Sequence, residues 1–390
     1  MDESFISQRV HVVQTPIIPT INQLVLEHPG TISLGQGVSY YGPPTEIYQA
    51  IEAKLNSKTL NAYGPVEGIP ELIEVLTQKL HTRNHIAINN DNCVFVTAGS
   101  NMAFSSLMQV IADPDDEIIL LTPYYFNHEM AIRLVNAKPV LVPTLDNFHP
   151  DLDKIKTSIT NKTRAIVTVS PNNPTAAVYS QDELTQINQL CAQHNIYHIS
   201  DEAYEDFIYE DNIHFSPATL TNSESHTISL YSLSKAYGFA GWRVGYMVIP
   251  KNIFTSLRKV QDTVLISPTI VSQYAAIGAH QAPYSYIEEK LKEIKQSRTI
   301  CLNALNQTDL LAKQATSEGA FYIFAKLNTQ ADDFNVAKSL IEKHGIATIP
   351  GSAFAANNGN FLRISYGALT SDTVEEGINK LIDGLTHLIV

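Results

Sequence analysis

The chain has little cysteine, few basic residues and no long apolar run, and each shortage excludes a class of protein. Its 390 residues include three cysteines, Cys93, Cys191 and Cys301, which are too few and too widely spaced for a disulfide framework. No CxxC or paired Cys/His motif indicates zinc, so we expect no metal. Lys and Arg number 26 against 39 Asp and Glu, and this net charge of -13 argues against a nucleic-acid surface. No apolar run approaches the roughly 20 residues of a membrane span.

The N-terminal residues 1–15 are polar and mixed in charge, and they lack the apolar core of a secretory signal peptide. Together with the reduced thiols that the cysteine pattern favours, this predicts a cytoplasmic protein. The hydrophobic content of 44% is typical of globular proteins. A chain of this length should form roughly two domains with a large buried core.

Short apolar runs alternate with helical patterns, which predicts an α/β fold with a largely parallel sheet. Strands are expected at 93–97, 117–122, 164–170, 196–200, 227–232, 244–249, 346–349 and 361–366. Helices are expected at 101–112, 180–194, 284–305, 332–344 and 372–388. The expected organisation is an N-terminal arm (1–40) that forms part of the small domain or packs on another subunit, a large domain (41–289) and a smaller α+β domain (290–390).

Five of the expected strands end in polar or aromatic motifs. These are Ala98-Gly-Ser-Asn101, Pro123-Tyr-Tyr125, Pro171-Asn-Asn-Pro174, Asp201-Glu-Ala-Tyr204 and Leu233-Ser-Lys235. In open α/β sheets, ligands bind beyond the carboxyl ends of the strands. We therefore expect the five motifs to face one site, although they lie far apart in the sequence.

The segment Ser232-Leu-Ser-Lys-Ala-Tyr-Gly-Phe-Ala-Gly-Trp-Arg243 carries the most chemical information. It places Lys235 just after the hydroxyls of Ser232 and Ser234 and shortly before Arg243. This is the set that pyridoxal 5'-phosphate (PLP) needs, because a lysine amine attaches to its aldehyde while hydroxyls and a guanidinium hold its phosphate. An isolated Ser-x-x-Lys is more often a polar turn, but the Gly-Trp-Arg that follows favours the cofactor.

Groups suited to the cofactor ring follow neighbouring expected strands. A carboxylate must keep the ring nitrogen protonated so that the ring can draw electrons from the substrate, and Asp201 is the candidate; its alternative role is a helix N-cap. Tyr204 and Asn173 are candidates to contact the phenolic oxygen, and Asn173 also the substrate carboxylate. Packing for Tyr204 and a turn at Asn-Asn-Pro are the alternatives. Tyr125 is placed to stack on the ring, although a single aromatic is more often core.

Two anionic groups, the cofactor phosphate and the substrate carboxylate, need partners of their own. Gly99, Ser100 and Asn101 open an expected helix, whose backbone N–H groups and dipole can hold the phosphate; a plain turn is the alternative. Arg363 lies on a mostly apolar strand, where burying it is costly unless it is paired. A substrate carboxylate would satisfy Arg363, and an internal salt bridge or an exposed edge is the alternative.

These residues together resemble class I/II aminotransferases of the fold-type-I PLP family over nearly the whole chain. Ser-x-Ser-Lys with Gly-Trp-Arg-x-Gly, and Asp-Glu-x-Tyr, are specific to that family. The family motif Asn-Pro-x-Asn-Pro-Thr-Gly stands here as Ser170-Pro-Asn-Asn-Pro-Thr-Ala176, which keeps the second Asn and replaces the first Asn and the last Gly. Pro350-Gly-Ser-Ala-Phe354 followed by Arg363-Ile-Ser365 also matches.

The resemblance implies a mostly parallel central sheet in a large domain beside a smaller α+β domain. It implies ping-pong transfer of an amino group between an L-amino acid and a 2-oxo acid, with Lys235, Asp201 and Tyr204 as catalytic residues. It also implies that Tyr63 reaches the phosphate of a neighbouring subunit, and hence a homodimer with shared active sites. Gly37 is assigned a backbone contact to the substrate carboxylate.

The preferred amino acid is predicted from fewer residues. Aspartate-recognising relatives often carry a Lys at the position that Asn101 occupies here. Tyr40, Tyr41, Tyr125 and Phe354 are candidates for an aromatic-lined pocket, or for packing at the domain interface. The segments that look like plant aromatic aminotransferases using methionine as donor are 34–37, 123–127 and 319–326. We expect an aromatic amino acid or methionine, with an aspartate-type enzyme as the alternative.

Other protein classes share part of this pattern. A PLP-dependent C–S lyase or an aminocyclopropanecarboxylate-synthase-like enzyme would use the same Lys, Asp and Arg, and motifs separate these poorly from a transaminase. An effector-binding domain of a transcription regulator would follow a basic DNA-binding module, which does not precede the motifs here. A nicotinamide dehydrogenase is disfavoured because no G-x-G-x-x-G follows an expected strand.

Overall fold

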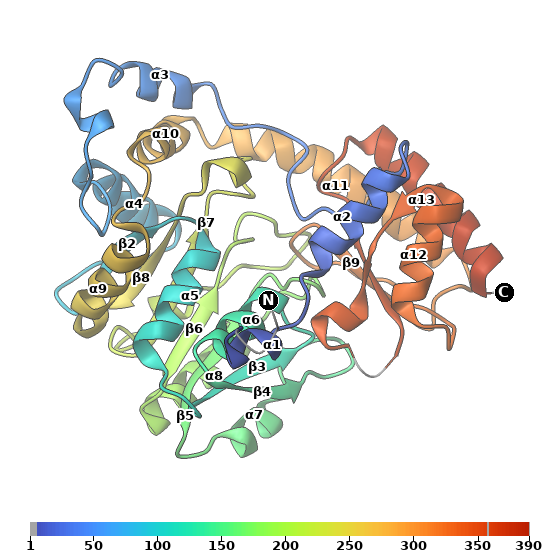
Figure 1. The fold of residues 1–390 in the computed structure, drawn as a ribbon, viewed down its shortest axis with the longest axis horizontal. Helices are drawn as coiled ribbons and strands as arrows, with labels where there is room; N and C mark the ends of the chain where they lie inside the picture. The colour runs from blue at the N-terminus through green and yellow to red at the C-terminus, as the bar shows by residue number, and fades with distance from the viewer. Residues whose placement is uncertain (1–5, 357–358, 390) are drawn as a thin grey trace.

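The structure is a computed structural model that describes residues 6–356 and 359–389 (Figure 1). Its largest element is a seven-stranded sheet in the order β2-β8-β7-β6-β5-β3-β4. The strands of this sheet are β2 (Asn92–Thr97), β3 (Glu117–Thr122), β4 (Lys138–Pro143), β5 (Thr163–Val169), β6 (Tyr197–Asp201), β7 (Thr227–Ser232) and β8 (Gly245–Pro250). β8 runs antiparallel to both of its neighbours, and the other adjacent pairs are parallel. The expected α/β fold with a largely parallel sheet is confirmed.

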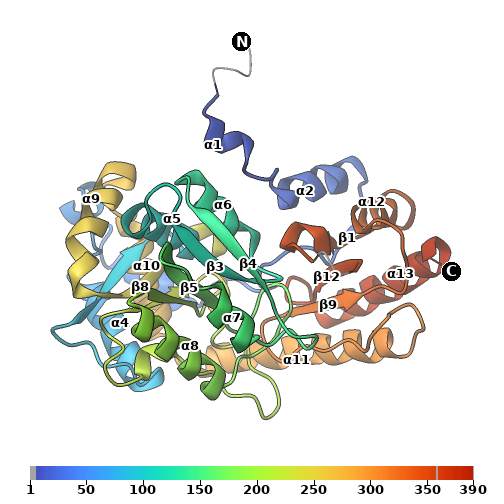
Figure 2. The ribbon, with the colours of Figure 1, turned by 90° about the horizontal axis from the view of Figure 1, so that it is seen from below.

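Helices cover both faces of this sheet (Figure 2). Successive side chains of a strand point to opposite faces, and apolar side chains on both faces need a helix to pack against. On β3, Ile118 and Leu120 pack with side chains of α5, α6 and α9, whereas Ile119 and Leu121 pack with those of α7 and α8. The helices around the sheet are α3 (Glu46–Glu52), α4 (Pro70–Arg83), α5 (Ser100–Ile111), α6 (Phe126–Leu134), α7 (Leu152–Ser158), α8 (Gln181–His194), α9 (Phe254–Leu265) and α10 (Ile270–Gln281).

The long helix α11 (Ser285–Asn306) runs from the large sheet and its helices to a second, smaller group of strands and helices (Figures 1 and 2). We call this second group the smaller layer. There a three-stranded antiparallel sheet has the order β11-β12-β9 and is accompanied by the pair β1-β10. These strands are β1 (Ile32–Ser33), β9 (Tyr322–Lys326), β10 (Ile346–Ala347), β11 (Ile349–Pro350) and β12 (Phe361–Ser365). The remaining helices are α1 (Gln8–His11), α2 (Ile17–Glu27), α12 (Asp333–His344) and α13 (Ser371–Ile389).

All five motif-bearing strands end at the same edge of the large sheet. β3, β5, β6 and β7 are mutually parallel, and β2 has the same direction because the antiparallel β8 stands between it and β7. The five motifs therefore lie along one edge, as the sequence predicts.

Most expected elements are present with ends shifted by one or two residues. The capping box of Ser180 and Glu183 opens α8, and Gly345 ends α12 in the left-handed conformation, at φ 61°. The single strand expected at 346–349 is wrong, because Thr348 separates two short strands that pair in different sheets. The elements not among those expected are β1, β4, β9, α1, α2, α3, α4, α6, α7, α9 and α10. The proposed domain limits stay a prediction.

The N-terminal arm contributes to the smaller layer. Ile32 and Ser33 pair with Ile346 and Ala347, and α2 packs on α12. Within the described residues, none of the helices combines the length and the hydrophobicity that crossing a bilayer requires.

Candidate active site

A cavity of about 240 Å³ opens at the edge of the large sheet where the five motifs end. It is far larger than the roughly 10–15 Å³ that a cavity needs to hold one water, so it can admit a small molecule. The predicted site residues that line it are Gly37, Ser100, Asn101, Tyr125, Asn173, Asp201, Tyr204, Ser232, Ser234, Lys235, Arg243 and Arg363. Gly99 lies directly behind this wall, against Arg243. Tyr63 does not line the cavity, and 83% of its surface is exposed.

Lys235 lies in the turn after β7, and its amine points into the cavity. Its Nζ donates a hydrogen bond to the carbonyl of Gly37 and lies 5.8 Å from the centre of the Tyr204 ring. Burial, together with the positive charges of Arg363 and Arg243, lowers the pKa of Lys235 to about 8. This lowered pKa makes the neutral amine, the form that a nucleophile or a proton acceptor needs, far more accessible near neutral pH than in a free lysine.

Asp201, the last residue of β6, is held in place from two sides. Its Oδ2 lies 3.1 Å from Nε2 of His128, and its Oδ1 accepts a hydrogen bond of 3.1 Å from the backbone N–H of Ala203. The His128 ring stacks on Phe104 with ring centres 4.1 Å apart. A buried carboxylate that accepts from two donors is held in one orientation, and it can accept a further hydrogen bond from a cationic partner in the cavity.

The N-terminus of α5 and Arg243 form a cationic corner. Gly99 is the N-cap residue at φ 87°, and no side chain of the described residues caps this end, so its first N–H groups remain available. A Cβ at Gly99 would lie 2.6 Å from Nη2 of Arg243, so glycine permits this close approach. Ser232 and Ser234 line the same cavity, where a backbone N–H, hydroxyls and a guanidinium together suit a phosphate.

Arg363 lies on β12, and 2% of its surface is exposed. Its Nη1 donates to Oδ1 of Asn173 at 2.9 Å, and its Nη2 donates to the carbonyl of Gly35 at 2.8 Å. No Asp or Glu in the described part of the chain forms an ion pair with it, so the alternatives of an internal salt bridge and an exposed edge are wrong. A buried guanidinium without a charged partner at the cavity wall suits an incoming carboxylate.

Tyr204 belongs to a buried polar cluster with Tyr322 and Asn173. Its hydroxyl lies 2.7 Å from that of Tyr322, and the amide Nδ2 of Asn173 lies 3.5 Å from it. Burial and the neighbouring Tyr322 raise the pKa of Tyr204 well above its ordinary value. Tyr204 therefore stays protonated over the physiological range and can donate a hydrogen bond.

Together these features fit PLP. Lys235, the carboxylate of Asp201 and the cationic corner at the N-terminus of α5 face one cavity, and at that corner a side chain in place of Gly99 would collide with Arg243. The aminotransferase class I and II family model matches residues 29–381. The chain belongs to the aminotransferase class I and II family. It is a PLP-dependent transaminase.

Relatives of different substrate preference support this assignment. The chain is 30% identical to an aromatic aminotransferase of Arabidopsis thaliana, covering 98% of this chain and 97% of the relative. It is 32% identical to a probable aspartate/prephenate aminotransferase of Thermus aquaticus, covering 97% of each. The crystal structure of an aromatic aminotransferase from Pyrococcus horikoshii superposes with a TM-score of 0.86 at 31% identity, covering 94% of this chain and 99% of that one.

Several residues at the site were not predicted from the sequence, and His128 and Tyr322 are two of them. His128 lies three positions after Tyr125, the N-cap residue of α6, and the centres of the two rings are 5.3 Å apart, so this spacing was a usable signal. Tyr322 stands in an apolar strand that reads as core, and no local pattern distinguishes it.

The aromatic pocket expected from four residues is present in part. Tyr125 lines the cavity, but Tyr40, Tyr41 and Phe354 do not. The Tyr41 hydroxyl donates a hydrogen bond of 3.1 Å to the backbone carbonyl of Ala236, next to Lys235. Phe354 is fully buried, and its ring centre lies 5.1 Å from the guanidinium carbon of Arg363. These side chains support the site rather than line it.

Proposed function

We propose that this transaminase acts on an aromatic L-amino acid or methionine, and passes the amino group to a 2-oxo acid by a ping-pong mechanism. The observation that carries the proposal is the charge of the cavity wall. Its cations among the described residues are Lys235, Arg243 and Arg363, and each has a use in binding cofactor or α-carboxylate. The side-chain carboxylate of an acidic substrate would therefore find no further cation on the described cavity wall to pair with.

The rest of the wall favours an apolar side chain. Ile18, Val38, Tyr125, Phe126 and Tyr322 contribute apolar or aromatic surface. Asn101 offers an uncharged amide, and it accepts a hydrogen bond of 3.3 Å from the Tyr125 hydroxyl. Desolvating an unpaired carboxylate against this surface would cost several kcal/mol, whereas an aromatic ring gains from burial.

Each residue has a role in this proposal. Arg363, Asn173 and the Gly37 backbone orient the substrate carboxylate. The phosphate would be held by Gly99, Ser100, Asn101, Ser232, Ser234 and Arg243, and Tyr125 would stack on the ring. PLP, when bound, supplies an electron sink that acidifies the substrate α-carbon. Asp201 would keep the ring nitrogen protonated, Tyr204 would donate to the phenolic oxygen, and Lys235 Nζ would take the proton from the substrate Cα.

The assembly proposed is a cytoplasmic homodimer in which Tyr63 of each chain serves the other active site. The strong exposure of Tyr63 in the single chain supports this, since an aromatic ring in water gains from a partner surface. The domain division at 40/41 and 289/290 is part of the same proposal.

An acidic substrate is the second candidate, because a relative named aspartate/prephenate aminotransferase matches over nearly the whole chain. The decisive experiment mixes the purified holoenzyme with one amino acid at a time, without a 2-oxo acid, and follows the visible absorption of the cofactor. We expect phenylalanine, tyrosine, tryptophan or methionine to convert the cofactor at least about tenfold faster than aspartate, which corresponds to about 1.4 kcal/mol in the transition state.

A faster reaction with aspartate would overturn the proposed substrate while leaving the transaminase assignment intact. The same assay separates a lyase from a transaminase. A transaminase stops after one equivalent of 2-oxo acid, whereas a C–S lyase continues without an acceptor and releases ammonia or a thiol. Arg363→Lys is the matched control, because it should slow every amino acid alike.

A further inference from the structure

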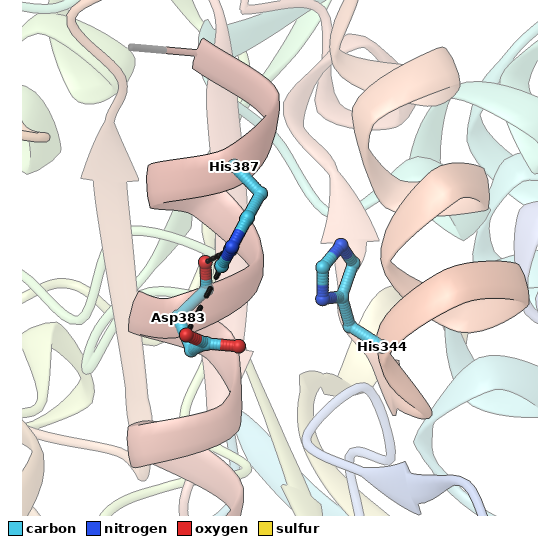
Figure 3. A group of neighbouring side chains, drawn as sticks. All are labelled: His344, Asp383 and His387. Atoms are coloured by element: carbon cyan, nitrogen blue, oxygen red, sulfur yellow. Dashed lines mark hydrogen bonds and ion pairs between the residues drawn. The ribbon is translucent and has the colours of Figure 1, made fainter.

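Two histidines and an aspartate meet on the surface of the smaller layer, at the ends of α12 and α13 and away from the cavity (Figures 1 and 3). His344 is in the last turn of α12, and Asp383 and His387 are one turn apart on α13. One ligand atom from each side chain lies within 4.8 Å of the others. Figure 3 shows the Asp383 carboxylate directed toward the space in front of His344.

Packing between the two helices brings these side chains together. Gly384 lies beside Asp383 on α13, and a Cβ there would lie 2.9 Å from Cγ of His344. The missing side chain lets the His344 ring lie close to α13. The centres of the His344 and His387 rings are 5.7 Å apart.

The state of His387 also suits a metal. Its Nδ1 lies 2.8 Å from the backbone carbonyl of Asp383, which can only accept, so Nδ1 carries the proton. Nε2 then keeps its lone pair, and this second bond fixes the ring, as the outer hydrogen bond of a metal-binding histidine does. Both histidines are near helix C-termini, where the dipoles favour a cation.

We propose that His344, Asp383 and His387 form a surface site for a divalent transition metal of the Zn²⁺ class, which joins α12 to α13. Two imidazoles and one carboxylate are a zinc ligand set that leaves the fourth tetrahedral position to water. Mg²⁺ and Ca²⁺ prefer oxygen ligands and are excluded by this chemistry. Tetrahedral ligands stand about 3.4 Å apart, and the ligand atoms here already lie within 4.8 Å of one another, so small shifts, mainly of the exposed Asp383 side chain, close the remaining distance.

This site could not be predicted from the sequence, because the two histidines are far apart in the chain and only the packing of α12 on α13 brings them together. Single exposed histidines carry no metal signal. The proposed metal is independent of the transaminase chemistry, since none of its three ligands lines the cavity.

The test uses the PLP-loaded enzyme after treatment with a chelator, titrated with ZnCl₂ in a calorimeter at neutral pH. We expect one saturable site per chain in the wild type. His344→Ala and His387→Ala should each weaken binding at least about tenfold, because losing a direct ligand costs no less than losing an outer hydrogen bond. His194→Ala is the matched control, since His194 is an exposed histidine in the last turn of α8, and it should bind as the wild type does.

Thermal unfolding provides a second measurement. Zn²⁺ should raise the midpoint of the wild type and of His194→Ala, but not that of the two ligand variants, and MgCl₂ should raise none of them. Substitution with Co²⁺ should give visible bands typical of nitrogen and oxygen ligands, which excludes the thiol of Cys93 as the binding group. Absence of saturable binding, or equal binding by all variants, would overturn the proposal.

Discussion

Nε2 of His128 lies 3.1 Å from Oδ2 of Asp201, and this contact links α6 to the end of β6 beneath the cavity. Because the carboxylate accepts here, Nε2 carries the proton, and Nδ1 has no partner among the described residues. The stacking of His128 on Phe104 holds the ring so that it fixes the orientation of the carboxylate. His128 is thus a positioning residue for Asp201.

Replacing His128 with Phe tests this relationship, because the ring can still stack on Phe104 but the donor is lost. Hydrogen bonds to charged groups contribute about 1.5–3 kcal/mol, so we expect kcat to fall about tenfold to a hundredfold. Asp201→Ala should cost several orders of magnitude. A positioning role also predicts a changed pH profile of kcat, measured by stopped-flow and steady-state assays. An unchanged kcat and pH profile in His128→Phe would show that the contact has no role.

Replacing Lys235 tests its lowered pKa in the cofactor-free protein. The ordinary value of 10.5 falls to about 8, so the folded state binds this proton less tightly than the unfolded state. The charged amine therefore destabilises the fold below pH 8, and this penalty disappears as pH rises from about 8 to 10.5. At pH 7 the penalty is on the order of 3 kcal/mol.

Lys235→Met should thus raise the free energy of unfolding of the cofactor-free enzyme at pH 7 by about 1–3 kcal/mol, with the gain shrinking toward pH 10. Urea unfolding at several pH values measures this. The variant should also lose turnover while it still binds PLP without a covalent bond. A gain that does not depend on pH would point to packing as its cause, and unchanged turnover would refute the catalytic role.

The fold and most of the site could be predicted because local signals and topology agree. The residues between Ser232 and Arg243 combine hydroxyls, a lysine and a guanidinium in one segment, so their chemistry is visible without the structure. Parallel strands then place the other motifs, such as that of Asp201, along the same edge. The edge-strand β4 was missed because two prolines, Pro139 and Pro143, interrupt its pattern.

The side chains that support this site could not be predicted, since their roles depend on contacts between distant elements. Tyr322 reaches Tyr204 through the pairing of β9 with β12, and nothing in its own segment indicates this. By its position in the sequence Tyr41 resembles a substrate-pocket residue, but its hydroxyl donates a hydrogen bond to the backbone carbonyl of Lys235. Arg363 was predictable because a buried charge on an apolar strand has few explanations.

Replacing Arg363 with Lys keeps the charge and removes the planar fork. Its two bonds, to Asn173 and Gly35, show how the guanidinium is oriented toward the cavity. We expect KM for the amino acid to rise about tenfold to a hundredfold, which corresponds to about 1.4–2.7 kcal/mol, with a smaller effect on PLP affinity. Arg298→Lys is the control, since Arg298 pairs with Glu210 outside the cavity. Equal KM values in both variants would contradict the role of Arg363.

His149 predicts a pH-dependent contribution to stability. It lies 2.9 Å from Glu183 and 3.3 Å from Glu318, and these hydrogen bonds raise its pKa from 6.5 to about 9. The contribution is therefore complete below about pH 6.5 and is lost as pH rises through 9. Because His149 is partly exposed and screened, we expect about 1 kcal/mol. His149→Gln should lower the unfolding free energy at pH 6 but hardly at pH 10, and a loss of equal size at both values would contradict the ion pairs.

Tyr63 tests whether the active sites are shared between subunits. Tyr63→Phe should weaken PLP binding about tenfold through loss of one hydrogen bond to a charged phosphate, and Lys235→Ala should abolish turnover. In a mixed dimer, the Lys235→Ala chain would lend its intact Tyr63 to the site of the Tyr63→Phe chain. That site would then hold both residues.

Co-expression of the two variants with different tags allows the mixed dimer to be isolated, and its activity can be measured at limiting PLP. If Tyr63 crosses to the partner, one site per mixed dimer recovers wild-type PLP affinity, so about half of the wild-type activity returns. If Tyr63 acts in its own chain, every site that keeps Lys235 still lacks the hydroxyl, and PLP affinity stays at the level of the Tyr63→Phe dimer. Recovery of affinity in the mixed dimer therefore requires a site built from both chains, because neither variant can supply it alone.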